Sequence, residues 1–323
     1  MEYSITNMFA EKATEDVYAK AFAVGVETEQ REQFPLVSVL MASYNHAPYV
    51  EAAVRSVMDQ KGVSFELIVI DDGSKDDSPT ILEKLSKELG FRYKHRENKG
   101  VVATCNELLE MAKGKYFCSF ASDDIMPAGR LAEQSSYLGR HPQYIACFGQ
   151  IKQMDAHGNV AKEFDPRYLK SIPQVTFEQF FLGEREIHGC SEMLEVTAFR
   201  EMGGYDASIG QEDFPMILRL LHKCSPLPVV KTDCCHYRIH GNNLSAANSV
   251  ENVDFLYKNM LDTVECYKNH PLYKKARKLW KARYFSALTN CSKREALKRL
   301  PELASATTFF WLRTLKLILP KRK

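Results

Sequence analysis

The sequence lacks several features that mark common protein classes. It has no unbroken apolar run of about 18 residues, and its mean hydropathy is −0.32, so we expect no membrane-spanning helix. The 43 Lys and Arg nearly balance the 41 Asp and Glu, and a net charge of +2 argues against binding to nucleic acid. Only 16 Gly and 13 Pro among 323 residues exclude a collagen-like chain, and 45% hydrophobic residues indicate an ordered globular protein.

Secretion and cysteine-based structure are also not indicated. Residues 1–11 contain no basic stretch followed by an apolar one, so we expect no signal peptide and a cytoplasmic protein. The nine cysteines are odd in number and irregularly spaced, with no CxxC pair, which favours free thiols in a reducing compartment. The same spacing argues against a zinc site built on cysteines.

Strands and helices are predicted to alternate between residues 35 and 125. Apolar, β-branched runs predict strands at residues 36–42, 65–70, 91–95 and 116–120. Helical periodicity predicts helices at residues 49–60, 79–89 and 101–112. This order is typical of an α/β fold with a mostly parallel central sheet and helices on both faces.

Polar clusters follow three of the predicted strands. They are Ser43-Tyr44-Asn45, Asp71-Asp72-Gly73-Ser74 and Ser122-Asp123-Asp124. Because ligands of such sheets bind outside the carboxyl ends of the strands, we expect these clusters to meet at one edge. The acids suit Mg²⁺ or Mn²⁺, and hence a metal-bound nucleoside diphosphate, although a single acid there can equally form a turn or cap a helix. The absence of GxGxxG and GxxxxGK[ST] motifs argues against dehydrogenases and P-loop NTPases.

The order of these motifs resembles the family 2 glycosyltransferases, which have the GT-A fold. The matching residues are Val39 through Tyr44-Asn45, Val69-Ile70-Asp71-Asp72-Gly73-Ser74, Asn98-Lys99-Gly100 with Asn106, and Ala121-Ser122-Asp123-Asp124. The resemblance implies an inverting, metal-dependent transfer from a nucleotide-sugar donor, with Mn²⁺ or Mg²⁺ as cofactor. The implied acceptor is a hydroxyl of a saccharide or lipid-linked saccharide, in surface polysaccharide or glycan assembly.

The same resemblance implies roles for residues of the donor site. Ala42, Tyr44 and Asp72 would hold the nucleotide base, Asp123 would reach the ribose, and Asp124 would coordinate the metal at the diphosphate. The other matching donor-site positions are Asn45, Gly100, Asn106 and Ser122. Since a serine stands at the first acidic position of the DxD-type motif, metal binding would depend mainly on Asp124.

A second group of motifs lies between residues 187 and 245. Gly203-Gly204-Tyr205-Asp206, Glu212-Asp213 and the segment from His236 to Ser245 resemble patterns of the same family. The transfer needs a carboxylate that takes the proton of the attacking hydroxyl, and the resemblance assigns this role to Asp213. Glu212 would touch the donor sugar or position the acceptor, and capping of a helix is the alternative for both acids. Arg238 would contact phosphate or these two acids, and His240 would complete the metal site or bind the diphosphate.

The chain is expected to divide into three parts. Residues 1–34 would form an N-terminal helical arm, and residues 35–250 the GT-A domain, with a nucleotide-binding half (35–125) and an acceptor half (126–250). Residues 251–323 would form a helical extension. Its basic amphipathic tail, which begins at Phe309, suits an anionic membrane surface, a core or a dimer, so peripheral membrane binding and an oligomer are both left open.

Other functions of the same fold are also considered. A non-catalytic subunit that binds a nucleotide sugar would need the donor site but no turnover. A nucleotidyltransferase would use similar metal-bound acids, but it usually needs a glycine-rich, basic phosphate loop near its N-terminus, and none is found. A processive polysaccharide synthase would carry transmembrane helices and a Gln-x-x-Arg-Trp motif, so an enzyme that adds a single sugar is favoured.

Overall fold

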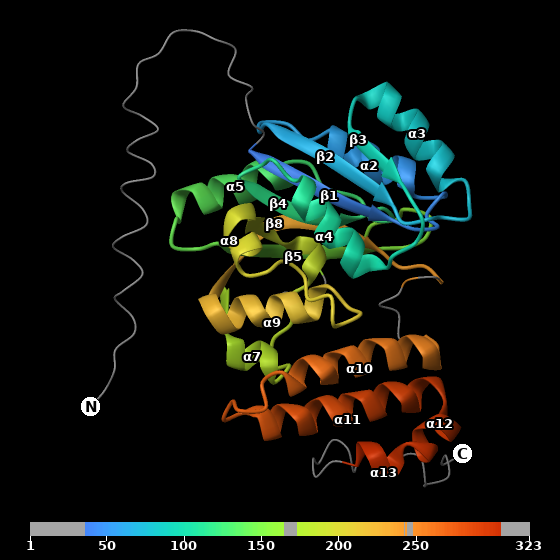
Figure 1. Ribbon diagram of the computed structural model, residues 1–323, viewed down its shortest axis with the longest axis vertical. Coiled ribbons are helices and arrows are strands. Elements are labelled where there is room, and N and C mark those ends of the chain that lie inside the picture. The colour runs from blue at the N-terminus through green and yellow to red at the C-terminus, as the bar shows by residue number, and fades with distance from the viewer. Residues whose placement is uncertain (1–35, 165–172, 242, 244–247, 305–323) are drawn as a thin grey trace. The chain divides into compact units, whose positions relative to one another are not determined.

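A mixed sheet forms the centre of the protein (Figure 1). The computed structural model describes residues 36–164, 173–241, 243 and 248–304. The eight strands lie in the order β3-β2-β1-β4-β7-β5-β8-β6. They are β1 (Val37–Ser43), β2 (Phe65–Asp71), β3 (Arg92–His95), β4 (Tyr116–Ala121), β5 (Ala146–Met154), β6 (Gln174–Val175), β7 (Met193–Glu195) and β8 (Leu227–Arg238).

The sheet is mostly parallel, as the sequence predicted. β1 lies between β2 and β4 and is parallel to both, so Ala42 is opposite Ile70 on one side and Ala121 on the other. β3 is parallel to β2, and β5 is parallel to β8. The short strand β7 is antiparallel to both of its neighbours, and β6 is antiparallel to β8. The parallel register brings the carboxyl ends of β1, β2 and β4 to one edge of the sheet.

Helices cover both faces of the sheet because its strands are apolar on both sides. Successive residues of a strand point to opposite faces, so Val39 packs with the cluster that includes α2, α3 and α5, whereas Leu40 packs with α4, α8 and α9. The helices are α2 (Val50–Met58), α3 (Ser78–Leu89), α4 (Val101–Met111), α5 (Arg130–Arg140), α7 (Phe177–Phe181), α8 (Val196–Glu201) and α9 (Asp213–Cys224). The predicted helices and strands up to residue 125 are confirmed, with ends shifted by no more than two residues.

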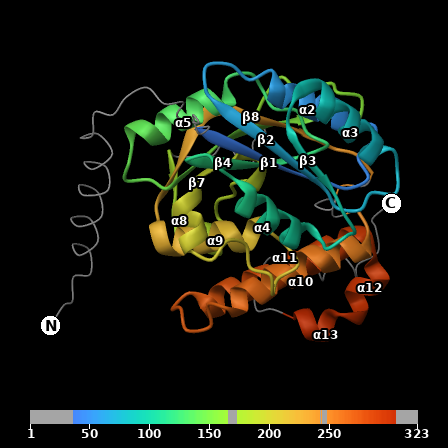
Figure 2. The same cartoon turned by 45° about the horizontal axis from the view of Figure 1, so that its top comes forward.

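Helices after residue 250 pack against the same core. They are α10 (Val250–Glu265), α11 (Tyr273–Cys291), α12 (Lys293–Lys298) and α13 (Leu300–Leu303). Two views show α10 and α11 side by side, next to α9 (Figure 1 and Figure 2). Trp280 of α11 donates its Nε1–H to the carbonyl of Phe181 at 2.9 Å, and its ring meets that of Phe214 edge-on at 4.9 Å. The predicted helical extension is therefore present and shares the apolar core that supports α9.

Two predicted segments lie outside the described residues. These are the N-terminal arm at residues 1–34 and the basic tail that begins at Phe309. Within the described part of the chain, no helix combines the length and the apolar character needed to cross a membrane.

A buried arginine joins α5 to β8 and to the segment before β7. Arg130 is fully buried, and its guanidinium donates to the carbonyl oxygens of Cys234 and Glu192, both at 2.9 Å, and to Oε1 of Gln134 at 3.1 Å. Because this side chain satisfies several buried acceptors at once, its removal leaves them without partners and also creates a cavity.

We expect Arg130→Ala to lower the free energy of unfolding by about 3–5 kcal/mol, as for other buried charged groups that lose their network. The measurement is urea unfolding followed by circular dichroism. Arg140→Ala is the matched control, because Arg140 lies in the same helix but is exposed and makes one bond, to the Ser136 carbonyl at 3.3 Å. It should change stability by no more than about 0.5 kcal/mol. Equal effects of the two variants would contradict a structural role for Arg130.

Candidate functional site

The ends of β1, β2 and β4 are joined by hydrogen bonds between the predicted polar clusters. The amide of Asn45 donates to Oγ of Ser74, and the Asn45 side-chain oxygen accepts from the amide of Lys75, both at 2.8 Å. The Ser122 hydroxyl lies 2.8 Å from Nδ1 of His46. The predicted convergence of these clusters on one edge is confirmed. Asn45 has a φ of 55°, a conformation that asparagine tolerates better than most residues.

Asp72 uses its carboxylate to hold the start of α4. One oxygen accepts from the amide of Lys99 at 2.8 Å and the other from the amide of Gly100 at 2.9 Å. Arg96 adds an ion pair to the same carboxylate. Gly100 is the residue before α4 and has a φ of 86°, which explains the glycine at this position. Asp72 and Gly100 thus form a capping interaction at the predicted donor edge.

Three other predicted donor-site residues have distinct surroundings. The side-chain amide of Asn106 exchanges two hydrogen bonds with the backbone of Tyr205, at 2.8 and 2.9 Å, so it ties α4 to the Gly204–Tyr205 turn. Ala42 is half-buried in β1, whereas the Tyr44 ring is 45% exposed just after the strand. Tyr44 is therefore accessible to a planar ligand, while the known contacts of Asn106 are structural.

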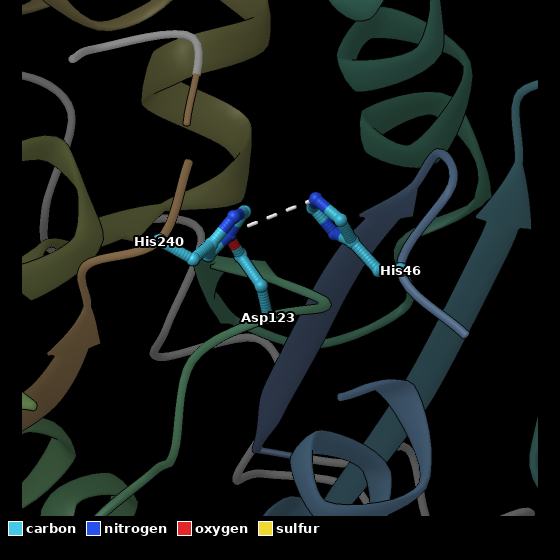
Figure 3. A group of neighbouring side chains, drawn as sticks. All are labelled: His46, Asp123 and His240. Atoms are coloured by element: carbon cyan, nitrogen blue, oxygen red, sulfur yellow. Dashed lines mark hydrogen bonds and ion pairs between the residues drawn. The ribbon is translucent and has the colours of Figure 1, made fainter. Parts of the chain in front are cut away.

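Asp123 lies between two histidines at the end of β4 (Figure 3). Its Oδ2 is 2.9 Å from Nε2 of His240 and 3.7 Å from Nε2 of His46. Burial opposes the charged carboxylate, but the His240 hydrogen bond and the positive potential of both rings outweigh it and lower the pKa of Asp123. Burial is also the main reason that the pKa of His46 is lowered.

Asp124 points in another direction and meets two cysteines. Its Oδ1 accepts from the amide of Arg238 at 2.8 Å, and its Oδ2 accepts from Sγ of Cys235 at 3.3 Å. Oxygen and sulfur atoms of Asp124, Cys190 and Cys235 lie within 4.8 Å of one another. Burial, followed by the charge of Asp123, raises the pKa of Asp124 well above its usual range. The sequence offered His240 either for the metal site with Asp124 or for the diphosphate; in the structure its Nε2 lies 2.9 Å from Oδ2 of Asp123, and both roles stay predictions.

Arg238, the last residue of β8, contacts the residues around Asp123 and Asp124. Its Nε donates to the carbonyl of Asp123 at 2.6 Å, and its guanidinium stacks 4.7 Å above the Tyr49 ring. A second nitrogen donates to the carbonyls of Asp155 and Ala156 at 3.4 and 3.3 Å. Arg238 is thus placed beside Asp123 and Tyr49, and within the described residues it forms no hydrogen bond or ion pair with Glu212 or Asp213, which the sequence offered as alternatives to phosphate.

Asp213 begins α9 and lies against a glycine. Its Oδ1 accepts from the Gln211 side chain at 2.8 Å and from the amide of Phe214 at 2.6 Å. A Cβ on Gly189 would come within 2.8 Å of Cβ of Asp213, so only glycine fits there without displacing the acid. Glu212 is the residue before the helix, and burial followed by the charge of Asp213 raises its pKa to about 7.

The turn between residues 188 and 190 connects Asp213 to Asp124. The amide of Cys190 donates to Nδ1 of His188 at 3.2 Å. Burial lowers the pKa of His188, but the charges of Cys190, Asp213 and Asp124 outweigh it, and the pKa is raised to about 9. Gly189 lies against Asp213, and a carboxylate oxygen of Asp124 lies within 4.8 Å of Sγ of Cys190, so both acids lie around this turn.

The chain matches known glycosyltransferases in sequence. The profile of the family described as Glycosyl transferase family 2 covers residues 38–203. The chain belongs to glycosyltransferase family 2. Two Bacillus subtilis relatives are the glycosyltransferase EpsH, 37% identical over 216 residues (64% of this chain and 61% of EpsH), and the teichuronic acid biosynthesis glycosyltransferase TuaG, 37% identical over 107 residues (32% and 42%). The chain spans only 28% to 55% of the length of the first curated relatives that it matches.

Solved structures of glycosyltransferases share this fold. Residues 1–349 of S. aureus TarS in complex with UDP-GlcNAc superpose with a TM-score of 0.61 at 17% identity, covering 87% of this chain and 79% of that chain. The mannosyltransferase PcManGT from Pyrobaculum calidifontis, in complex with GDP-Man and Mn²⁺, gives a TM-score of 0.59 at 16% identity, covering 90% and 82%. The GT-A fold implied by the motifs is therefore confirmed.

The acids of this family 2 member suit a divalent cation. Asp123 and Asp124 are adjacent carboxylates that are 6% and 1% exposed, and burial, followed by the charge of Asp123, raises the pKa of Asp124. A hard cation that takes oxygen ligands, such as Mn²⁺ or Mg²⁺, would offset both effects by bringing positive charge. The chemistry of the donor set therefore fits the metal that the family resemblance implies.

Several residues at this edge were not anticipated as candidates from the sequence. They are His46, His188, Cys190, Glu192 and Cys235. His46 directly follows the Tyr44-Asn45 motif, so the rule that strand ends bind ligands could have included it. Cys190 and Cys235 are far apart in the sequence, and a search for short cysteine spacings could not bring them together.

The buried side chain of Glu192 makes the stability of the protein depend on pH. Glu192 is 1% exposed, and burial raises the pKa of its carboxyl group from 4.5 to about 8. Between these values the unfolded chain loses the Glu192 proton while the folded chain keeps it. The folded state therefore binds more protons, and stability falls as the pH rises through this window.

We expect Glu192→Gln to remove that loss. The stability of the variant relative to the wild type should rise from pH 5 to pH 8, by on the order of 2–4 kcal/mol, and then remain constant. The measurement is the urea midpoint as a function of pH. Glu195→Gln, on the adjoining strand β7 and half-exposed, is the matched control and should leave the pH profile of the wild type unchanged. Parallel profiles for Glu192→Gln and the wild type would rule out titration of a buried Glu192.

Proposed function

We propose that this family 2 member transfers one sugar from a nucleoside diphosphate sugar to a hydroxyl group, with inversion at the anomeric carbon. The observation that carries the proposal is the position of Asp124 and Asp213 around the turn at residues 188–190, where Asp213 lies against Gly189 and Asp124 lies within 4.8 Å of Sγ of Cys190. A donor diphosphate near Asp124 would then present its sugar towards Asp213. Placement of both acids at one edge is what a direct displacement by an acceptor hydroxyl requires.

The donor is proposed to lie along the ends of the first strands. The exposed Tyr44 ring, with Ala42 and Asp72, would hold the base, and Asp123 would accept hydrogen bonds from the ribose. Asn45, Gly100, Asn106 and Ser122 would support this site through the hydrogen bonds that fix its loops. TarS and PcManGT were solved with UDP-GlcNAc and GDP-Man, which supports a nucleotide-sugar donor without indicating which one this chain uses.

Asp213 is proposed as the general base. Its Oδ1 already accepts two hydrogen bonds, so Oδ2 is the oxygen left to take the proton of the acceptor hydroxyl. The bonds to Gln211 and Phe214 fix the carboxylate, and contact with Gly189 limits its movement. Glu212, whose pKa is raised to about 7, would be partly protonated near neutral pH and could donate a hydrogen bond to the donor sugar or the acceptor.

Asp124 is proposed to hold Mn²⁺ or Mg²⁺ at the diphosphate, and Arg238 lies next to it. Such a cation, when bound, neutralises charge on the departing nucleoside diphosphate. Asp124 is already oriented by the Arg238 amide, so little reorganisation of this chain is needed. His240 would line the diphosphate side of the same site through its bond to Asp123.

The acceptor is proposed to be a saccharide or a lipid-linked saccharide of a surface polysaccharide. The name of the relative TuaG, which refers to teichuronic acid biosynthesis, supports this class of acceptor. The same proposal includes three further features. The basic tail would bind an anionic membrane, the protein would be cytoplasmic, and it would form an oligomer. Membership of family 2 argues against a nucleotidyltransferase. A non-catalytic subunit would differ from the proposed enzyme by binding the donor without turnover.

A panel of nucleotide sugars with Mn²⁺ tests the donor. A donor that binds only the native state should raise the melting temperature, by an amount that increases with its concentration relative to its Kd. The control is the same panel with Asp124→Asn, in which the effect of Mn²⁺ on donor binding should be lost. If no nucleotide sugar raises the melting temperature of the wild type, the proposed donor site is wrong.

Asp213→Asn tests the base. Slow hydrolysis of the donor, measured as release of nucleoside diphosphate, should fall by about 100-fold or more because the proton acceptor is lost. The shift in melting temperature caused by the donor should persist. Glu201→Gln, on the exposed surface of α8, should retain the wild-type rate. If Asp213→Asn hydrolyses the donor at the wild-type rate, another residue is the base. If the wild type binds the donor but does not turn it over, the protein is the non-catalytic subunit.

A further inference from the structure

Two cysteine side chains lie together near the end of β8, although they are far apart in the sequence. Cys190 belongs to the single turn η1 (Gly189–Ser191), and Cys235 belongs to β8. Their Sγ atoms lie within 4.8 Å of each other, and both side chains pack with the same apolar cluster. Both are free thiols. The fold thus brings two reduced sulfur atoms from separate segments close to each other.

A buried arginine holds the backbones of these two segments side by side. The Arg130 guanidinium donates to the carbonyl oxygen of Cys234 and to that of Glu192, both at 2.9 Å. The first of these residues directly precedes Cys235, and the second lies two residues after Cys190. Because Arg130 is fully buried, breaking either bond would leave a buried polar group without a partner. The two thiols are therefore kept near each other by bonds that are costly to lose.

Only a small movement separates the two thiols from a covalent bond. A disulfide has an S–S length of about 2.05 Å, so the sulfur atoms need to approach by less than about 3 Å. Rotation of a cysteine side chain between two staggered rotamers moves its sulfur by about 3 Å. Cys235 lies in a strand paired with β5, whereas Cys190 lies in a single turn, so we expect Cys190 to make most of the movement.

The two thiols differ in their access to solvent. Cys190 is half-buried, whereas Cys235 is fully buried. An oxidant from solvent therefore reaches Cys190 first. A second thiol beside an oxidised cysteine can react with it before the cysteine is oxidised further, which is the arrangement of reversible redox cysteines.

We propose that Cys190 and Cys235 form a reversible disulfide when the protein meets a peroxide. Hydrogen peroxide oxidises the Cys190 thiol to a sulfenic acid and releases one water. The sulfur of Cys235 then attacks the sulfenic sulfur, the S–S bond forms, and the S–OH oxygen leaves as a second water. Two thiols thus lose two electrons and two protons, and one peroxide is reduced to two waters. A dithiol reductant reverses the reaction by exchange.

One consequence rests on the proposed function. The Cys235 thiol donates to Oδ2 of Asp124 at 3.3 Å, and the disulfide would remove this donor. Gly189, in the same turn as Cys190, lies against Asp213 and would move with the turn. The oxidised protein would therefore hold both acids differently. Loss of a group that orients a metal ligand typically lowers activity by about tenfold or more, and we expect donor hydrolysis to fall to this extent.

Peptide mapping of the oxidised full chain, without nucleotide or metal, tests the disulfide. The folded protein is treated with hydrogen peroxide, its remaining thiols are alkylated, and it is digested with trypsin in the absence of reductant. We expect a linked pair of peptides, residues 186–200 and 232–238, which a dithiol reductant separates. This measurement requires no turnover, so its result does not depend on the proposed function.

Variants assign the two sulfur atoms. Cys190→Ser and Cys235→Ser should each abolish the linked pair, and circular dichroism with thermal melting shows whether each variant is folded. Cys234→Ser is the matched control, because Cys234 is equally buried but its Sγ packs against Gly149 of β5, so the pair should still form. Two results would overturn the disulfide. One is a wild type without the linked pair, whether Cys190 is recovered as a thiol or as a sulfinic acid, and the other is a pair that persists in folded Cys235→Ser.

Donor hydrolysis tests the consequence separately. The rate of the wild type should fall by about tenfold or more after oxidation and return with reductant. Cys190→Ser should have the same rate before and after the peroxide treatment. An unchanged rate in a fully linked wild type would overturn the effect on the donor site. If the reduced wild type hydrolyses no donor, the proposed function is wrong, and the peptide map alone decides whether the disulfide forms.

Discussion

Two adjacent carboxylates at the end of β4 determine how the rest of the site is arranged. Asp123 and Asp124 are both buried, and neighbouring buried charges of the same sign are unfavourable unless each finds separate partners. In the structure, the side chains of the two acids point in different directions. Asp123 meets His240 and His46, whereas Asp124 meets the backbone of Arg238 and the thiol of Cys235. The end of β8 and the residues just after it supply partners to both acids.

Residues that form the donor edge also build the fold. Asp72 caps α4, and Asn106 joins that helix to the turn before α9. These motif residues therefore act as caps and turn contacts in the structure, and their part in a ligand site stays a prediction. Because the donor edge is assembled from the caps of its own helices, binding there would also stabilise the helix ends that surround it.

The sequence predicted the first strands and helices well because their signals are local. Alternation of apolar runs with helical periodicity, and polar residues directly after each strand, depend on residues close together in the chain. The partners of the acids could not be predicted in this way. Placement of His240 on Asp123 rather than on Asp124, and of Cys190 beside Cys235, depends on how β8 and the segment before β7 pack against β4. Sequence spacing carries no information about these side-chain directions.

The contact between Trp280 and Phe214 links the C-terminal helices to the position of Asp213. Trp280 supports α9 through Phe214, the residue next to Asp213, and Asn259 of α10 accepts from the Gly210 amide just before that helix at 2.9 Å. The helices after residue 250 thus hold the segment that presents Asp213. Relatives that differ in these helices would also differ in the tilt and height of their acid above the sheet. Under the proposed function, the C-terminal helices would therefore help to determine the shape of the acceptor site.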